Sequence, residues 1–197
     1  MKLETSMRFI TGLLFATILI LSACNPGNKF EVIGKFDAMV GVRKMEFPSY
    51  RNTEKNRGGI NFRYEGDTRT MIFDGLAGDF VNGQPDLPML AVVFKSNLDG
   101  RNVELDSIKL HKVFTIKTVR HVFYRSNATT GSQTATNPVI DAQGNVSFEF
   151  SADLYRIDAN TNKPVQDEAP LHVEGIFSGV IPEDQRHAPS IAHGSEF

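Results

Sequence analysis

Apolar and polar residues alternate with the two-residue period of β-strands along most of the chain after residue 29. The clearest alternation covers residues 146–155, where the apolar side chains on one face are Val146, Phe148, Phe150, Ala152 and Leu154. Similar alternation predicts strands at residues 30–36, 60–65 and 171–181. Residues 88–94 are apolar at nearly every position, which predicts a central strand covered on both faces.

Other segments have weaker patterns. Residues 39–47 alternate less cleanly, and residues 103–110 change phase in the middle, as a strand with a β-bulge does. Residues 112–124 are rich in β-branched and aromatic side chains and are predicted to form one long strand. Residues 49–59 and 126–138 are polar and are predicted to be exposed loops.

These strands are separated by turns, and no helical stripe longer than two turns follows the N-terminal segment, so we predict an all-β fold. We expect an antiparallel β-sandwich of about eight to ten strands. It forms a single β domain over residues 30–181, followed by a loose tail over residues 182–197. A closed, lipocalin-like barrel is the alternative, but the Gly-x-Trp signature of lipocalins is impossible because the chain has no tryptophan.

The N-terminal segment has a different pattern, in which a basic residue precedes an apolar run broken only by Thr11, Gly12 and Thr17. Arg8 supplies the charge, and residues 10–21 supply the run, which is too short to span a bilayer as a helix. The run ends at Leu21-Ser22-Ala23-Cys24, which contains the only cysteine of the chain. This tetrapeptide resembles the lipobox of bacterial lipoprotein precursors, in which cleavage falls between the last two residues, here Ala23 and Cys24, and the thiol carries the lipid.

The resemblance implies that residues 1–23 are a signal peptide and that residues 24–29 hold the acylated cysteine and a short linker. A transmembrane anchor and an ordinary secretory signal are the alternatives. The first needs a longer apolar run, and the second leaves a single exported thiol unexplained. Met1 and Met7 are both available as starts, and the choice does not affect the mature chain.

The residues after the cysteine refine the predicted location. The extended linker from Asn25 to Asn28 reaches about 13–14 Å, so the domain is expected close to the membrane surface. Asn25 stands where an aspartate favours inner-membrane retention of enterobacterial lipoproteins, and no acidic export signal follows the cysteine. In a host with two membranes, the resemblance therefore implies the periplasmic face of the outer membrane in preference to the inner membrane or the cell surface.

Composition limits the partners and the core. The formal net charge is −2, and the densest basic segment, residues 51–57, also contains an acidic residue, so nucleic acid is not an expected partner. A single cysteine committed to lipid excludes an intrachain disulfide. With 15 phenylalanines and no tryptophan, phenylalanine is expected to fill most of the core.

The sequence lacks the common catalytic signatures. It contains no G-x-S-x-G, P-loop, G-x-G-x-x-G, H-E-x-x-H or C-x-x-C motif. The five histidines are His111, His121, His172, His187 and His193. We interpret them as residues of polar strand faces or of the tail, and we expect no catalytic residue, no metal and no cofactor.

One segment resembles the beginning of a calcium-binding loop. Asp158, Asn160 and Asn162 place side-chain oxygens at alternate positions. Lys163 then stands where such a loop needs glycine, and Ala169 stands where it needs glutamate. An Asn-rich turn is the favoured interpretation.

Another candidate is a ligand patch near the end of the predicted long strand. Aromatic and polar side chains of this kind can line a binding surface. The residues are His121, Tyr124, Arg125 and Tyr155. Ordinary decoration of exposed strand faces is the alternative interpretation.

Three functional hypotheses follow. The leading one is a non-enzymatic envelope lipoprotein, anchored in membrane lipid through Cys24, whose β domain binds or scaffolds another envelope protein. The second is a carrier of a small apolar ligand, which requires a large interior cavity. The third is a hydrolase with an active site assembled from separate strands, which requires a cleft with paired carboxylates and raised acid pKa values.

Overall fold

The computed structural model describes residues 29–55, 58–77, 80–81, 84–85, 88–115, 119–126 and 132–186. The predicted signal peptide and the lipobox with Ala23 and Cys24 lie outside these residues, as do His187 and His193. The predictions made for them therefore stay predictions.

Thirteen β-strands and one short 3-10 helix, Glu183–Gln185, make up the regular structure of the described residues. The strands are β1 (Phe30–Val40), β2 (Arg43–Asn52), β3 (Ile60–Glu65), β4 (Thr68–Leu76), β5 (Phe80–Val81), β6 (Gln84–Pro85), β7 (Met89–Asn97), β8 (Glu104–Thr115), β9 (Val119–Ser126), β10 (Gln133–Ala135), β11 (Val139–Ile140), β12 (Asn145–Ile157) and β13 (Leu171–Val180).

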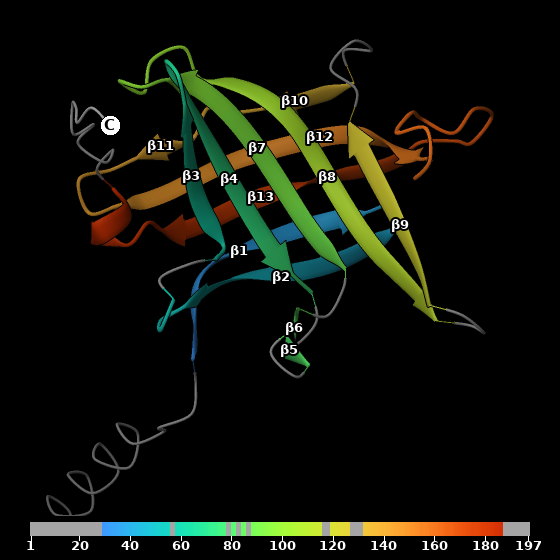
Figure 1. Cartoon of the computed structure of the whole chain (residues 1–197), viewed down its shortest axis with the longest axis horizontal. Helices are drawn as coiled ribbons and strands as arrows, with labels where there is room; N and C mark the ends of the chain where they lie inside the picture. The colour runs from blue at the N-terminus through green and yellow to red at the C-terminus, as the bar shows by residue number, and fades with distance from the viewer. Residues whose placement is uncertain are drawn as a thin grey trace, which may run out of the picture.

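Eleven strands form one antiparallel sheet, ordered β2-β1-β13-β12-β9-β8-β7-β4-β3, with β10 and β11 paired to β12. The sheet folds over itself so that β2, β1, β13 and β12 form one layer and the strands from β9 to β3 cross it as a second layer (Figure 1). The predicted all-β antiparallel sandwich is confirmed. The sheet path ends at β2 and β3 and is not closed into a barrel, so the barrel alternative is wrong.

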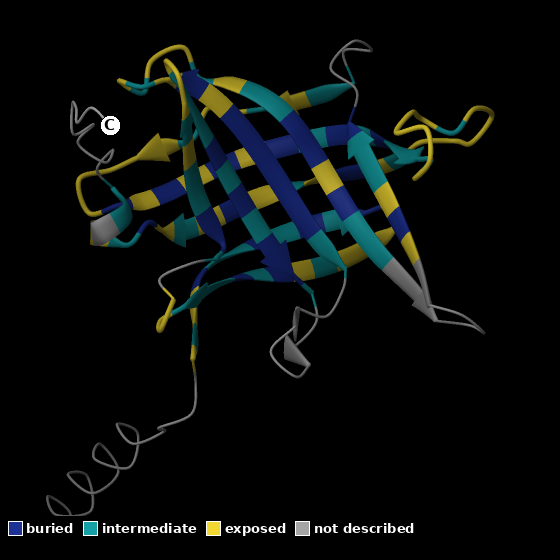
Figure 2. Cartoon of the chain, in the orientation of Figure 1, coloured by how far each residue is buried: buried dark blue, intermediate teal, exposed yellow. Residues whose placement is uncertain are grey.

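Phenylalanine rings fill the space between the two layers. Phe148 lies at the centre, with its ring centroid 4.9 Å from that of Phe73, 5.0 Å from Phe94 and 5.2 Å from Phe177. Buried positions gather where the layers cross, and exposed ones lie on the outer faces and loops (Figure 2). Phenylalanine is therefore at the centre of the core as predicted, but it does not fill most of it, because only seven of the 21 described residues in the buried core cluster are phenylalanine.

Several strand predictions are confirmed in detail. The inward side chains of β12 are buried as the alternation predicts. In β7, every residue from Leu90 to Phe94 is buried, as expected for a strand between two neighbours and covered on both faces. The phase change in β8 is a register shift opposite Val93 and Phe94, which pair with Ser107 and Leu105 and leave Asp106 as the extra residue.

Two other strand predictions are wrong, because each predicted strand covers parts of two antiparallel neighbours. Residues 39–47 contain the turn at Gly41 that joins β1 to β2, and residues 112–124 span the end of β8 and the start of β9. Part of the predicted loop over residues 126–138 forms β10, and the predicted loose tail begins with an ordered turn in which Arg186 Nε donates to the Ile181 carbonyl, 2.9 Å away.

Candidate functional site

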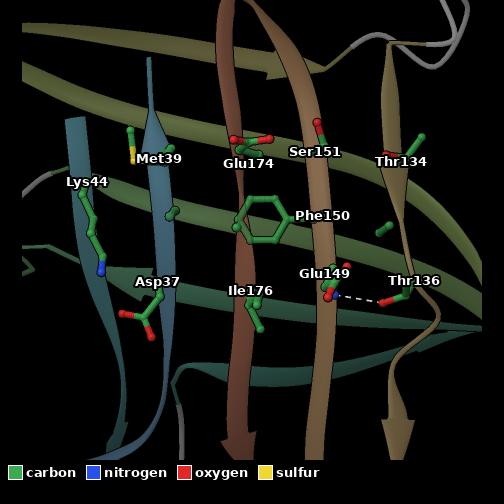
Figure 3. A pocket seen from close by; sticks show the side chains of 13 residues that line it. Asp37, Met39, Lys44, Thr134, Thr136, Glu149, Phe150, Ser151, Glu174 and Ile176 are labelled. Atoms are coloured by element: carbon green, nitrogen blue, oxygen red, sulfur yellow. Dashed lines mark hydrogen bonds between the residues drawn. The ribbon is translucent and has the colours of Figure 1, made fainter. Parts of the chain in front are cut away.

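A groove of about 620 Å³ lies on the outer face of β1, β13 and β12, between β2 on one side and β10 on the other (Figure 3). Strand register places its side chains in two rows. One row contains Asp37, Ile176 and Glu149, and the next contains Met39, Glu174 and Ser151. Lys44 pairs with Met39 at the β2 end of the second row, and Thr134 pairs with Ser151 at the β10 end.

Hydrogen bonds hold β10 in place as a wall of the groove. Thr136 Oγ1 accepts the backbone N–H of Glu149 at 2.8 Å (Figure 3). On the other side of β10, Gln133 Oε1 accepts from the Ser126 hydroxyl, and Gln133 Nε2 donates to the Asp106 carbonyl at 3.3 Å. The wall is therefore tied to both layers of the sandwich.

The groove combines an apolar floor with an acidic margin. Ile176, at 49% exposure, is one of the exposed large hydrophobic residues of the described chain. Asp37 and Glu149 lie opposite it on the neighbouring strands, and Glu174 is two residues away on its own strand. Asp37 is paired with Lys35 Nζ at 3.1 Å, and Lys44 is the one basic residue in the lining. These charges make the groove complementary to a cationic ligand.

His172 lies beside the groove, on the same strand as Glu174. Its Nδ1 is 2.8 Å from Asp153 Oδ1, and its Nε2 is 3.6 Å from Glu174 Oε2. The hydrogen bond to Asp153 raises the pKa of His172 above its ordinary value, and Glu174 adds to the rise.

Replacement of Asp153 by Asn should lower the pKa of His172, because the charged hydrogen-bond partner is lost. A raised folded-state pKa means that this contact stabilises the fold at low pH and that its contribution is lost as pH rises through that pKa. Imidazole chemical shifts followed by NMR against pH measure the change, with Asp141→Asn as a distant control. An unchanged His172 titration in Asp153→Asn would contradict the contact.

A second pocket, of about 460 Å³, lies on the outer face of β8 and β9 under the loop that follows β12. In one row, Met89, His111 and Phe123 are adjacent, and in the next row Lys109 lies directly opposite Arg125. The rings of His111 and Phe123 stack with centroids 4.2 Å apart. Burial lowers the pKa of His111, and the nearby His121 lowers it further.

The structure brings together part of the ligand patch predicted from sequence. Arg125 and Tyr155 lie directly opposite each other across β9 and β12. His121 is on the same face of β9 as Arg125, and His121 Nδ1 is 3.1 Å from His111 Nε2. Tyr124 borders the pocket, but strand alternation places its ring on the other face, where Lys112 Nζ is 5.5 Å from the ring centroid.

Sequence reasoning did not place in this pocket the side chains that give it most of its chemistry. They are Lys109, His111 and Phe123. The two-residue alternation along β8 and β9 puts these side chains on the exposed face of their strands. It shows that they lie together only once the pairing of β8 with β9 is known.

The candidate calcium loop forms the wall of the second pocket. Asp158 and Asn162 line it, and Asp158 Oδ1 accepts the backbone N–H groups of Asn160 and Thr161 at 2.9 and 2.8 Å. These hydrogen bonds lower the pKa of Asp158. The geometry is that of an Asx turn. No set of three or more metal-ligating side chains converges anywhere in the described part of the chain.

One carboxyl group with a raised pKa lies in neither site. Asp74 is on β4, where burial raises its pKa to about 6 although Gly59 and Asn61 hydrogen-bond to it. It is therefore not part of the carboxylate pair in a cleft that the hydrolase hypothesis requires.

Comparison of the chain with models of protein families, with curated proteins and with solved structures gives no match. Within the described ranges, no helix has the length and apolar character needed to cross a membrane. The candidate sites therefore rest on their geometry alone.

Proposed function

We propose that this chain is a lipid-anchored protein of the bacterial envelope whose β domain is a non-enzymatic binding module for another envelope protein. The observation that carries the binding role is the groove over β1, β13 and β12. The anchor is supported by the lipobox at Leu21-Ser22-Ala23-Cys24, and the absence of an aspartate after Cys24 supports the periplasmic face of the outer membrane.

The chemistry of the groove defines its partner. Exposed Ile176 offers an apolar contact, and the nearby carboxylates of Glu149 and Glu174 favour basic side chains beside it. A segment that presents apolar residues next to lysines or arginines fits this pattern. The packed phenylalanine core supports a binding surface outside the sandwich and gives no support to an apolar-ligand carrier.

Site-specific photo-cross-linking in intact cells tests the groove. A photoreactive amino acid at position 176 is expected to capture one discrete envelope protein. At position 180 it should not, although Val180 is on the same strand and face and is similarly exposed, at 44% against 49% for Ile176. Replacing both Glu149 and Glu174 by Lys should abolish the cross-link, because the acidic margin is reversed.

Two controls separate the parts of the proposal. Glu65→Lys with Glu104→Lys makes the same charge change on the other layer and should leave the cross-link intact. Equal capture from positions 176 and 180 would overturn the groove as the binding site. Cys24→Ala should yield an unprocessed chain without lipid, and a processed, membrane-bound Cys24→Ala protein would overturn the anchor.

A further inference from the structure

The pocket between the β8–β9 face and the loop after β12 has the features of a site for a small molecule. Its volume of about 460 Å³ lies in the range of ligand pockets. The pocket is built on the second layer of the sandwich and is independent of the groove on the first. It therefore calls for an explanation separate from binding of an envelope protein.

Two cations face each other in this pocket. Lys109 and Arg125 are directly opposed across β8 and β9, and like charges in that position destabilise a sheet. Neither forms an ion pair with another described residue. Asp106, whose pKa Lys109 helps to lower, is held at 2.6 Å by Lys95 Nζ instead. A bound anion would relieve this repulsion.

Apolar and aromatic side chains lie next to the two cations. Phe123 is 44% exposed, and its ring is held by stacking on His111. Met89 is in the same row. An exposed ring held in this way offers a flat contact to an apolar part of a ligand.

The acidic residue in the lining does not cancel the two cations. Asp158 carries one negative charge against the two positive charges of Lys109 and Arg125. Its Oδ1 is directed to the N–H groups of its own turn. An anion can therefore approach the cation pair while Asp158 keeps the loop folded over the pocket.

From these contacts we propose that this pocket binds a small organic anion, with its charged group between Lys109 and Arg125 and its apolar part against Phe123. The ligand class is a phosphate or carboxylate that bears an aromatic or other apolar group. A lipid headgroup and a free solute share this chemistry.

Calorimetric titration of the full chain, solubilised in a non-ionic detergent, with phenyl phosphate tests the proposal. Saturable binding with one site is expected. Lys109→Gln and Arg125→Gln should each weaken it by about ten-fold or more, because each removes a charge-assisted contact. Lys55→Gln, which removes an exposed positive charge outside the pocket, should leave it unchanged.

Inorganic phosphate tests the apolar part of the site. Phe123→Ala should weaken the binding of phenyl phosphate but not that of inorganic phosphate. The wild-type protein should bind phenyl phosphate more tightly than inorganic phosphate. Competition by short-chain phosphatidylglycerol, but not phosphatidylcholine, would assign the anion to a lipid headgroup, and no competition by either would assign it to a free solute. The proposal is overturned by the absence of saturable binding, by equal affinity for both phosphates, or by unchanged affinity in both cation variants.

Discussion

Replacement of Phe148 by Ala should lower the free energy of unfolding by about 3–5 kcal/mol, the usual cost of deleting a buried aromatic side chain. Phe148 is 3% exposed and contacts rings from both layers, including Phe36, Phe73 and Phe177. Its removal leaves a cavity that the surrounding rings, which are also packed against one another, can fill only in part. The loss is a large fraction of the stability of an ordinary domain, which is about 5–15 kcal/mol.

Urea denaturation followed by far-ultraviolet circular dichroism measures this loss, since the chain has no tryptophan to report by fluorescence. Phe123→Ala makes the same chemical change at a side chain that is 44% exposed, and it should cost less than about 1 kcal/mol. Equal losses in the two variants would show that Phe148 is not at the centre of the core.

Replacement of Asp74 by Asn should stabilise the protein at pH 8 by up to about 3 kcal/mol. Burial raises the pKa of Asp74 from 3.8 to about 6, so folding disfavours its ionised form. A raised folded-state pKa leaves stability highest below the unfolded value and lowers it as pH rises through about 6. Each unit of difference between the folded and unfolded pKa corresponds to about 1.36 kcal/mol, and the difference between 3.8 and about 6 therefore gives the expected gain.

The gain should disappear as pH falls well below 3.8, because the aspartate is then protonated in both the folded and the unfolded state. Urea denaturation at several pH values measures it. Asp106→Asn is the opposite control. Burial raises the pKa of Asp106, but hydrogen bonds from Lys95 and Ser107, together with the positive charges of Lys95 and Lys109, outweigh burial and lower it. That variant should therefore be destabilised at neutral pH. A pH-independent effect of Asp74→Asn would contradict the assigned cause.

The inside and outside faces of most strands could be predicted from the chain alone, but their ends could not. In β12, alternation identified every buried side chain. In β1, uninterrupted alternation over residues 30–36 would put Val32 on the same face as Phe36, yet Val32 is 58% exposed because the register shifts between Val32 and Gly34. A single extra residue reverses the phase, and nothing in the local pattern marks where it falls.

Which residues lie together in the candidate sites depended even more on how the strands pair. Arg125 and Tyr155 were singled out together from sequence, and the register makes them neighbours. Tyr124 was grouped with them, but it is adjacent to Arg125 along the strand and therefore faces the other side. The groove gave no signal in the sequence, because its two rows draw residues from β1, β12 and β13, which are far apart along the chain.

The sequence by itself determined the all-β class and predicted a phenylalanine-rich core and a lipobox, because each depends on residue type and on spacing within a few positions. The tertiary structure decided where hairpins divide the apolar runs, how the sheet folds into two layers, and which side chains share a row. Those features depend on hydrogen-bonded partners distant in the chain. The groove and the second pocket exist only once that register is set, since each is made of side chains that meet across strands.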